Sequence, residues 1–228
     1  KKAIAKSHAP APFTTSSMQQ DASNKLGFSS PETMSLAQHL YEGIETENGD
    51  HIAFITYMRT DSVRISAEAQ QSALARIREV YGDGYAPEKP NFYATKKGAQ
   101  DAHEAVRPIN PALTPAEVEK SVSGDPAKLY RLIWSRFMAS QMADCIQDTV
   151  SASITAGDYL FRASGFRVSF DGFTALYEES TDDAKKKETA LPPLEEGQTL
   201  KLKKLTADQK FTQPPPLYTE ATLIHALE

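Results

Sequence analysis

The chain has 228 residues, 40% of them apolar, so it is long enough to bury one large core or two smaller ones. Its single cysteine, Cys145, excludes an internal disulfide and a cysteine-rich zinc ribbon, and no stretch approaches the roughly 18 apolar residues of a membrane span. A formal net charge of -5 argues against indiscriminate coating of nucleic acid, but it allows one groove lined by a few cations.

Boundary signals predict two consecutive helices near the N-terminus. Ser17 with Gln20 forms a capping-box pattern, which predicts a short helix that ends at Gly27. A second such pattern, starting at Ser29, predicts a helix that ends at Gly43. The apolar face of this second helix is expected to contain Met34, Ala37, Leu40 and Tyr41.

The next segments alternate between strand, helix and loop. Residues 51–58 are rich in β-branched and aromatic types, so they predict a short strand that ends at Arg59. Ser66 caps a helix that is expected to run to Tyr81, where glycines follow. Residues 86–108 are expected to form an irregular, proline- and glycine-punctuated loop.

The second half of the chain begins with helices and turns to β structure. Capping patterns predict a helix starting at Thr114 and a longer one running from Asp125 to about Cys145. An acidic and lysine-rich exposed loop is expected at 178–196, and three prolines precede a terminal helix. Short alternating runs predict strands at 150–156, 159–163, 166–170, 174–177 and 199–205.

Residues 56–62 form the densest cluster of reactive side chains. In an extended run, alternation puts Tyr57 and Arg59 on one face, where a phenol and a guanidinium could reach the same phosphate. A free phenol, with a pKa of about 10, is a poor nucleophile at neutral pH, and a nearby cation favours the phenolate. The alternative is that the tyrosine belongs to a core or an interface while the arginine is simply solvated.

The surrounding motifs resemble those of bacterial type IA DNA topoisomerases. ITYMRTDS at 55–62 resembles the active-site tyrosine motif of that family, and QDAHEAVRP at 100–108 resembles its histidine segment at a similar spacing. PFTTSSMQQDA at 12–22 and PPPLYTEA at 214–221 are also similar to family blocks, and all occur in family order.

The resemblance implies a mechanism and roles for individual residues. Tyr57 would attack a phosphodiester of single-stranded DNA to give a 5′-phosphotyrosine link, and Arg59 would contact the scissile phosphate. Negatively supercoiled DNA would then relax without ATP after strand passage. Supporting or DNA-contacting roles are implied for Thr56, Thr60, Asp61 and His103, and as a weaker candidate for Arg107, which could instead pair with Glu104.

The resemblance also implies an α+β architecture, part of the type IA toroid. A helical tyrosine-bearing domain, 18–144, would be inserted into a β-rich arch formed by 1–17 and 145–215, and 216–228 would begin a further helical domain. The catalytic Mg²⁺ would be bound by an acidic domain outside this chain, so the chain alone is expected to be inactive. A monomer in the cytoplasm with no membrane association is expected, and no metal site is predicted within these residues.

Competing interpretations come from different classes. Tyrosine recombinases and type IB topoisomerases also combine Tyr, Arg and His, but they place His and Arg before a C-terminal tyrosine, whereas Tyr57 precedes His103 and Arg107 here. The chain could also be a non-catalytic helical DNA-binding module, or belong to a decatenating topoisomerase III. The amino-acid sequence of the tyrosine motif favours a relaxing topoisomerase I.

Overall fold

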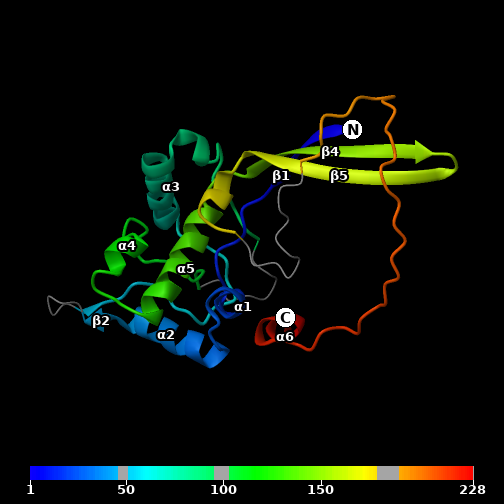
Figure 1. The fold of residues 1–228 in the computed structure, drawn as a ribbon. Coiled ribbons are helices and arrows are strands. Elements are labelled where there is room, and N and C mark those ends of the chain that lie inside the picture. The colour runs from blue at the N-terminus through cyan, green and yellow to red at the C-terminus, as the bar shows by residue number, and fades with distance from the viewer. Residues whose placement is uncertain (46–50, 95–102, 179–189, 228) are drawn as a thin grey trace.

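The computed structural model describes residues 1–45, 51–94, 103–178 and 190–227. Helices α1–α5 form one body, and a long antiparallel sheet projects from it (Figure 1). The chain after the sheet returns to this body, where α6 packs against α1. The helices are α1 (Thr15–Leu26), α2 (Ser30–Glu42), α3 (Ala67–Tyr81), α4 (Pro115–Val118), α5 (Asp125–Ser140) and α6 (Glu220–Leu227).

The sheet joins segments from the two ends of the helical body. Strand β1 (Lys2–Ser7) pairs antiparallel with β4 (Cys145–Ala156), which pairs with β5 (Tyr159–Phe170) in the order β1-β4-β5. The register places Ser7 opposite Cys145, so the chain leaves the sheet and returns to it at adjacent points. Helices with a separate antiparallel sheet agree with the predicted α+β class.

Local signals located most helix boundaries. The predicted starts of α2, α3, α4 and α5 are confirmed, and Ser29 and Thr114 each form a reciprocal capping box. The start of α1 was predicted too late, because Thr14 is the N-cap and Ser17 is the third helical residue of the same box. Helix α5 ends at Ser140, since Cys145 already begins β4.

Several predicted strands were wrong in extent or in kind. The runs at 159–163 and 166–170 form one strand, β5. The predicted strand at 174–177 is replaced by a 3₁₀ turn, Gly172–Ala175. Residues 199–205 are exposed and pair with no other strand among the described residues, because alternation alone supplies no hydrogen-bonding neighbour. Of the strand predicted at 51–58, only β3 (His51–Ile52) forms, paired with β2 (Ile44–Glu45).

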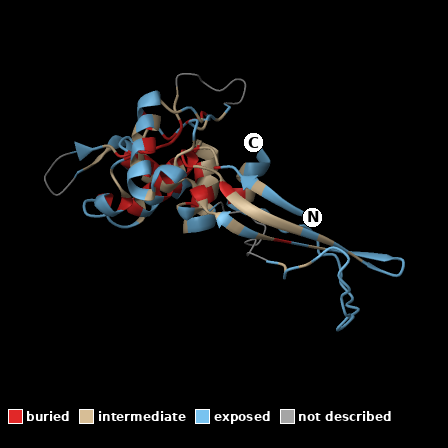
Figure 2. Cartoon of the chain, turned by 90° about the horizontal axis from the view of Figure 1, so that it is seen from above, coloured by how far each residue is buried: buried red, intermediate tan, exposed pale blue. Residues whose placement is uncertain are grey.

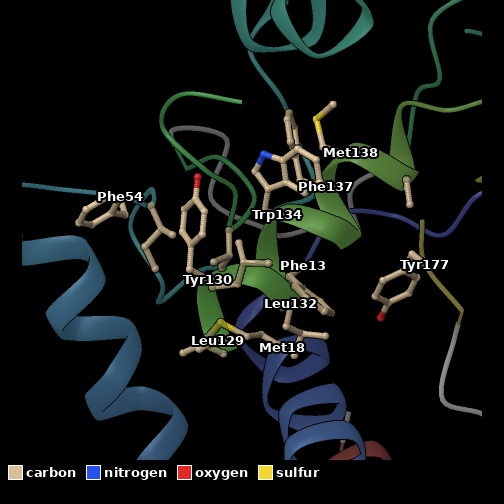
Figure 3. Packing of buried hydrophobic residues seen from close by; sticks show 14 of the residues in the cluster. Phe13, Met18, Phe54, Leu129, Tyr130, Leu132, Trp134, Phe137, Met138 and Tyr177 are labelled. Atoms are coloured by element: carbon tan, nitrogen blue, oxygen red, sulfur yellow. The ribbon is translucent and has the colours of Figure 1, made fainter. Parts of the chain in front are cut away.

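The hydrophobic core surrounds α5. Buried residues concentrate in the helical body, whereas the far part of the sheet is exposed (Figure 2). Tyr130 and Phe137 of α5 are fully buried together with Phe13 and Met18 (Figure 3). The Tyr130 hydroxyl donates to the carbonyl oxygen of Leu113 at 2.7 Å, and burial raises the pKa of this phenol.

A second set of polar contacts ties the helical body to the base of the sheet. The Tyr93 hydroxyl lies 2.8 Å from the carbonyl oxygen of Ser140 and 3.1 Å from that of Ala9, and burial raises the pKa of Tyr93 to about 12. Tyr85 donates to Asp171 at 2.8 Å beside the end of β5. None of the helices in the described ranges is long and apolar enough to cross a membrane.

Candidate active site

Tyr57 lies in an irregular segment that follows β3 rather than at the end of a strand. Within this segment only Ile55 forms a β-bridge, with Pro108, and the chain bends at Thr56, Met58 and Arg59, so it lacks the continuous ladder that a strand requires. The predicted alternation nevertheless holds. Tyr57, Arg59 and Asp61 are exposed, whereas the intervening Met58, Thr60 and Ser62 are buried. Tyr57 and Arg59 are therefore both exposed, and the face that they were predicted to share stays a prediction.

The segment with His103 runs alongside the tyrosine segment and fixes its backbone. The Thr56 amide donates to the carbonyl oxygen of Arg107 at 2.9 Å, and its hydroxyl donates to that of Ala105 at 2.7 Å. The Ile109 amide donates to the carbonyl oxygen of Phe54 at 2.9 Å. Thr56 thus joins the two segments immediately before Tyr57, while residues 100–102 of the predicted histidine motif and the Lys96–Lys97 pair lie outside the described residues.

The start of α1 holds the backbone on both sides of Arg59. The Thr15 hydroxyl donates to the carbonyl oxygen of Met58 at 2.7 Å and accepts from the Thr60 amide at 2.8 Å. The Thr15 amide, one of the helix N–H groups without an intrahelical partner, donates to the carbonyl oxygen of Thr60 at 2.8 Å. Sequence reasoning missed Thr15, although it lies within the family-like block at 12–22.

Replacing Thr15 by valine removes the hydroxyl that joins Met58 and Thr60 while keeping the shape of the side chain. We expect the free energy of unfolding to fall by about 1–2 kcal/mol, because a buried carbonyl and amide lose their partner. Urea unfolding measures this change. Thr15→Ser, which retains the hydroxyl, is the control and should stay close to wild type. A loss in Thr15→Ser with none in Thr15→Val would show that the methyl group, not the hydrogen bonds, matters.

Two aromatic rings hold the Tyr57 ring. The Tyr41 ring packs against Tyr57 in an edge arrangement with centroids 5.4 Å apart, and the His103 ring lies 5.7 Å away at a tilt of 57°. Tyr41 was expected on the buried face of its helix, but it is 37% exposed because it sits at the edge of that face. Tyr57 itself is 40% exposed, so a ligand can reach it.

Arg107 and Thr60 occupy structural positions. The Arg107 guanidinium pairs with Glu104, with Nε 3.0 Å from the carboxylate, and donates to the carbonyl oxygen of Pro108. The residue is 9% exposed, which favours support of the histidine segment over contact with a phosphate. Thr60 is buried, and its hydroxyl accepts from the Ser62 amide at 3.0 Å, which stabilises the turn after Arg59.

The whole chain matches one family model, that of DNA topoisomerases, over residues 1–228. The chain belongs to the DNA topoisomerase family. A solved structure of full-length topoisomerase I from Thermotoga maritima is similar, with 38% sequence identity and a TM-score of 0.82. That match covers 100% of this chain and 36% of the Thermotoga chain, so the present chain spans about a third of that relative. The resemblance to bacterial type IA topoisomerases is confirmed.

In the ranges that the structure describes, no three His, Cys, Asp or Glu side chains gather closely enough to hold a metal ion. The His103 ring lies beside the Tyr57 ring, and Arg59, two residues further along the chain, is exposed. An exposed phenol with an imidazole beside it is the arrangement that the described residues present to a ligand.

Proposed function

We propose that this chain supplies the nucleophile of an enzyme that relaxes negatively supercoiled DNA without ATP. Tyr57 attacks a phosphodiester of a single-stranded region, its oxygen bonds to the phosphorus, and the 3′ oxygen of the preceding nucleotide leaves. The broken strand is then held by a 5′-phosphotyrosine link while another strand passes. The reverse attack by the 3′-hydroxyl reseals the break and frees the tyrosine.

The single observation that carries this proposal is the exposed Tyr57 ring held by Tyr41 and His103, with the exposed Arg59 two residues along the chain. A fixed ring limits the conformations lost on reaching the phosphorus. The Arg59 guanidinium offers a charge that favours the phenolate and offsets negative charge developing on the attacked phosphate. Since one phosphate ester replaces another, the cycle needs no ATP.

Several functions of the enzyme belong to residues outside this chain. Mg²⁺, which the family resemblance implies, is assigned to a part of the longer relative that this chain does not span, because no described carboxylate cluster fits it. We therefore propose that the chain is inactive alone and acts within a monomeric, cytoplasmic enzyme. The similarity to a topoisomerase I favours relaxation over the decatenating activity of topoisomerase III.

We further propose that 18–144 moves as a unit relative to an arch formed by 1–17 and 145–215, with 216–228 beginning the next domain. The pairing of β1 with β4 supports this division, because it brings the entry and exit of the helical body to neighbouring positions in one sheet. Motion about these adjacent connections would separate Tyr57 from the domain that binds Mg²⁺ and open a passage for DNA.

The proposal is tested by determining which side of the break, 5′ or 3′, becomes joined to the enzyme. A full-length enzyme that contains this chain is mixed with Mg²⁺ and single-stranded DNA labelled at either its 3′ or its 5′ end, and is then denatured. Label is expected to travel with the protein only from the 3′-labelled DNA, because Tyr57 retains the fragment downstream of the break. Transfer from 5′-labelled DNA, or no transfer at all to an enzyme that binds the DNA, would overturn the assignment.

A further inference from the structure

A groove of about 440 Å³ runs along the exposed side of α2 and is closed at one side by Arg59. The helix residues that line it recur at intervals of three and four, so they form one stripe along the helix. This stripe covers 11 residue steps, which is about 16 Å of helix. The lining side chains used below are Pro31, Met34, Gln38, Glu42 and Arg59.

Tyr57 contacts the helix that carries the groove through the Tyr41 ring, although neither ring lines the groove. Tyr41 follows Met34 by seven residues, or nearly two full turns, so both side chains lie on the same side of α2. The Tyr57 ring packs on Tyr41 with centroids 5.4 Å apart, which places the nucleophile at the edge of the stripe. Arg59, an exposed residue two positions after Tyr57, forms part of the groove wall. The residue that contacts the candidate nucleophile, Tyr41, therefore lies on the side of α2 that carries the groove residue Met34.

We propose that this groove binds the deoxynucleotides on the 3′ side of the break, the part of the strand that becomes linked to Tyr57. The inference rests on the proposed function, which attaches the first downstream nucleotide to the Tyr57 oxygen through its 5′-phosphate. That nucleotide must lie within one sugar-phosphate unit of the ring. The groove is a recess near this position, since Arg59 lines it and follows Tyr57 by two residues.

The side chains of the groove match the parts of a nucleotide. Arg59 supplies a guanidinium for a phosphate, and Met34 with Pro31 supplies apolar surface for a base face. The Gln38 amide donates to the Glu42 carboxylate, which orients both groups. Their remaining acceptor oxygens suit the exocyclic amino groups of cytosine or adenine.

The charges of the groove also set the orientation of the strand. Glu42 repels phosphates, whereas Arg59 attracts them, so the backbone should follow Arg59 and the base edges should face Gln38 and Glu42. The alternative occupant of the groove is a segment of protein, which would bind the apolar surface but would not need a phosphate-binding cation near the nucleophile. We infer a preference for cytosine or adenine among the first downstream positions.

The test combines one protein change with one DNA change. The full-length enzyme carries Gln38→Ala or, as the matched control, Gln71→Ala, an exposed glutamine of α3 outside the groove. The DNA is 3′-labelled and single-stranded, either intact, without bases at the first two positions downstream of the break, or without bases at two upstream positions. The rate of covalent adduct formation is measured for each pair at subsaturating enzyme.

Gln38→Ala is expected to slow adduct formation roughly fivefold on intact and on upstream-abasic DNA, but not on downstream-abasic DNA, where no base edge remains to be contacted. Gln71→Ala should match wild type on all three. A Gln38→Ala defect that persists on downstream-abasic DNA, or no defect on any DNA, overturns the groove assignment alone. A wild-type enzyme that forms no adduct overturns the proposed function and this inference with it.

Discussion

Replacing Tyr57 by phenylalanine is expected to abolish covalent adduct formation and to lower DNA relaxation by at least roughly four orders of magnitude. The change removes only the oxygen that attacks the phosphorus. The ring still packs against Tyr41 and His103, so DNA binding and the free energy of unfolding should remain close to wild type. Gel assays of supercoil relaxation and adduct formation with the full-length enzyme measure the loss.

Tyr159→Phe is the matched control for this experiment. Tyr159 is 75% exposed on β5, far along the sheet from the helical body, so losing its hydroxyl should leave relaxation unchanged (Figure 1). Retained relaxation in the Tyr57 variant, with normal folding, would show that another group is the nucleophile. Loss of both adduct and DNA binding would instead indicate that the hydroxyl supports the structure rather than the chemistry.

Replacing Gly172 by alanine is expected to lower the free energy of unfolding by about 3–4 kcal/mol. Gly172 has φ +52°, a conformation that disfavours an L side chain. An added Cβ would also lie 2.5 Å from the carbonyl oxygen of Ala143 and closer still to that of Asp144. Both are backbone atoms of the link between α5 and β4, so relief of the collision requires movement where the helical body joins the sheet.

Two other glycines separate the backbone effect from the collision. Gly27 has φ +72° with nothing within 4 Å of an added Cβ, so Gly27→Ala should cost only about 1 kcal/mol. Gly84 has no positive φ, and no atom lies within 4 Å of a Cβ added there. Gly84→Ala should therefore change the free energy of unfolding by less than about 0.5 kcal/mol. Urea unfolding of all three variants orders them, and a Gly172 variant no less stable than the Gly27 variant would contradict the collision.

Gly172→Ala should lower stability but leave adduct formation largely intact, whereas Tyr57→Phe should abolish adduct formation and leave stability intact. Gly172 lies where the 3₁₀ turn meets the α5–β4 link, and the Phe173 amide donates to the carbonyl oxygen of Ala143 at 3.0 Å. Disturbing this link loosens the connection between the helical body and the sheet, but it leaves the Tyr57 oxygen in place. Adduct formation should therefore survive at temperatures where the variant is folded.

The sequence by itself determined the features that depend on residues within one helical turn. Caps such as Ser29 and Thr114 need only a partner three residues away, so the helices that they begin were predicted correctly. The alternation of exposed and buried residues around Tyr57 and Arg59 was also predicted correctly, although the segment bends and forms no regular strand. The position of the α1 cap was ambiguous, because Thr14 and Ser17 both carry the required hydroxyl.

Only the tertiary structure decided which distant segments meet. The pairing of β1 with β4, the hold of Thr15 on the backbone around Arg59 and the packing of Tyr41 on Tyr57 all join residues separated by long stretches of chain. The predicted strand at 199–205 failed for the same reason, since alternation does not provide a neighbouring strand. Hydrogen bonds and packing between remote segments depend on the whole fold, which local pattern does not encode.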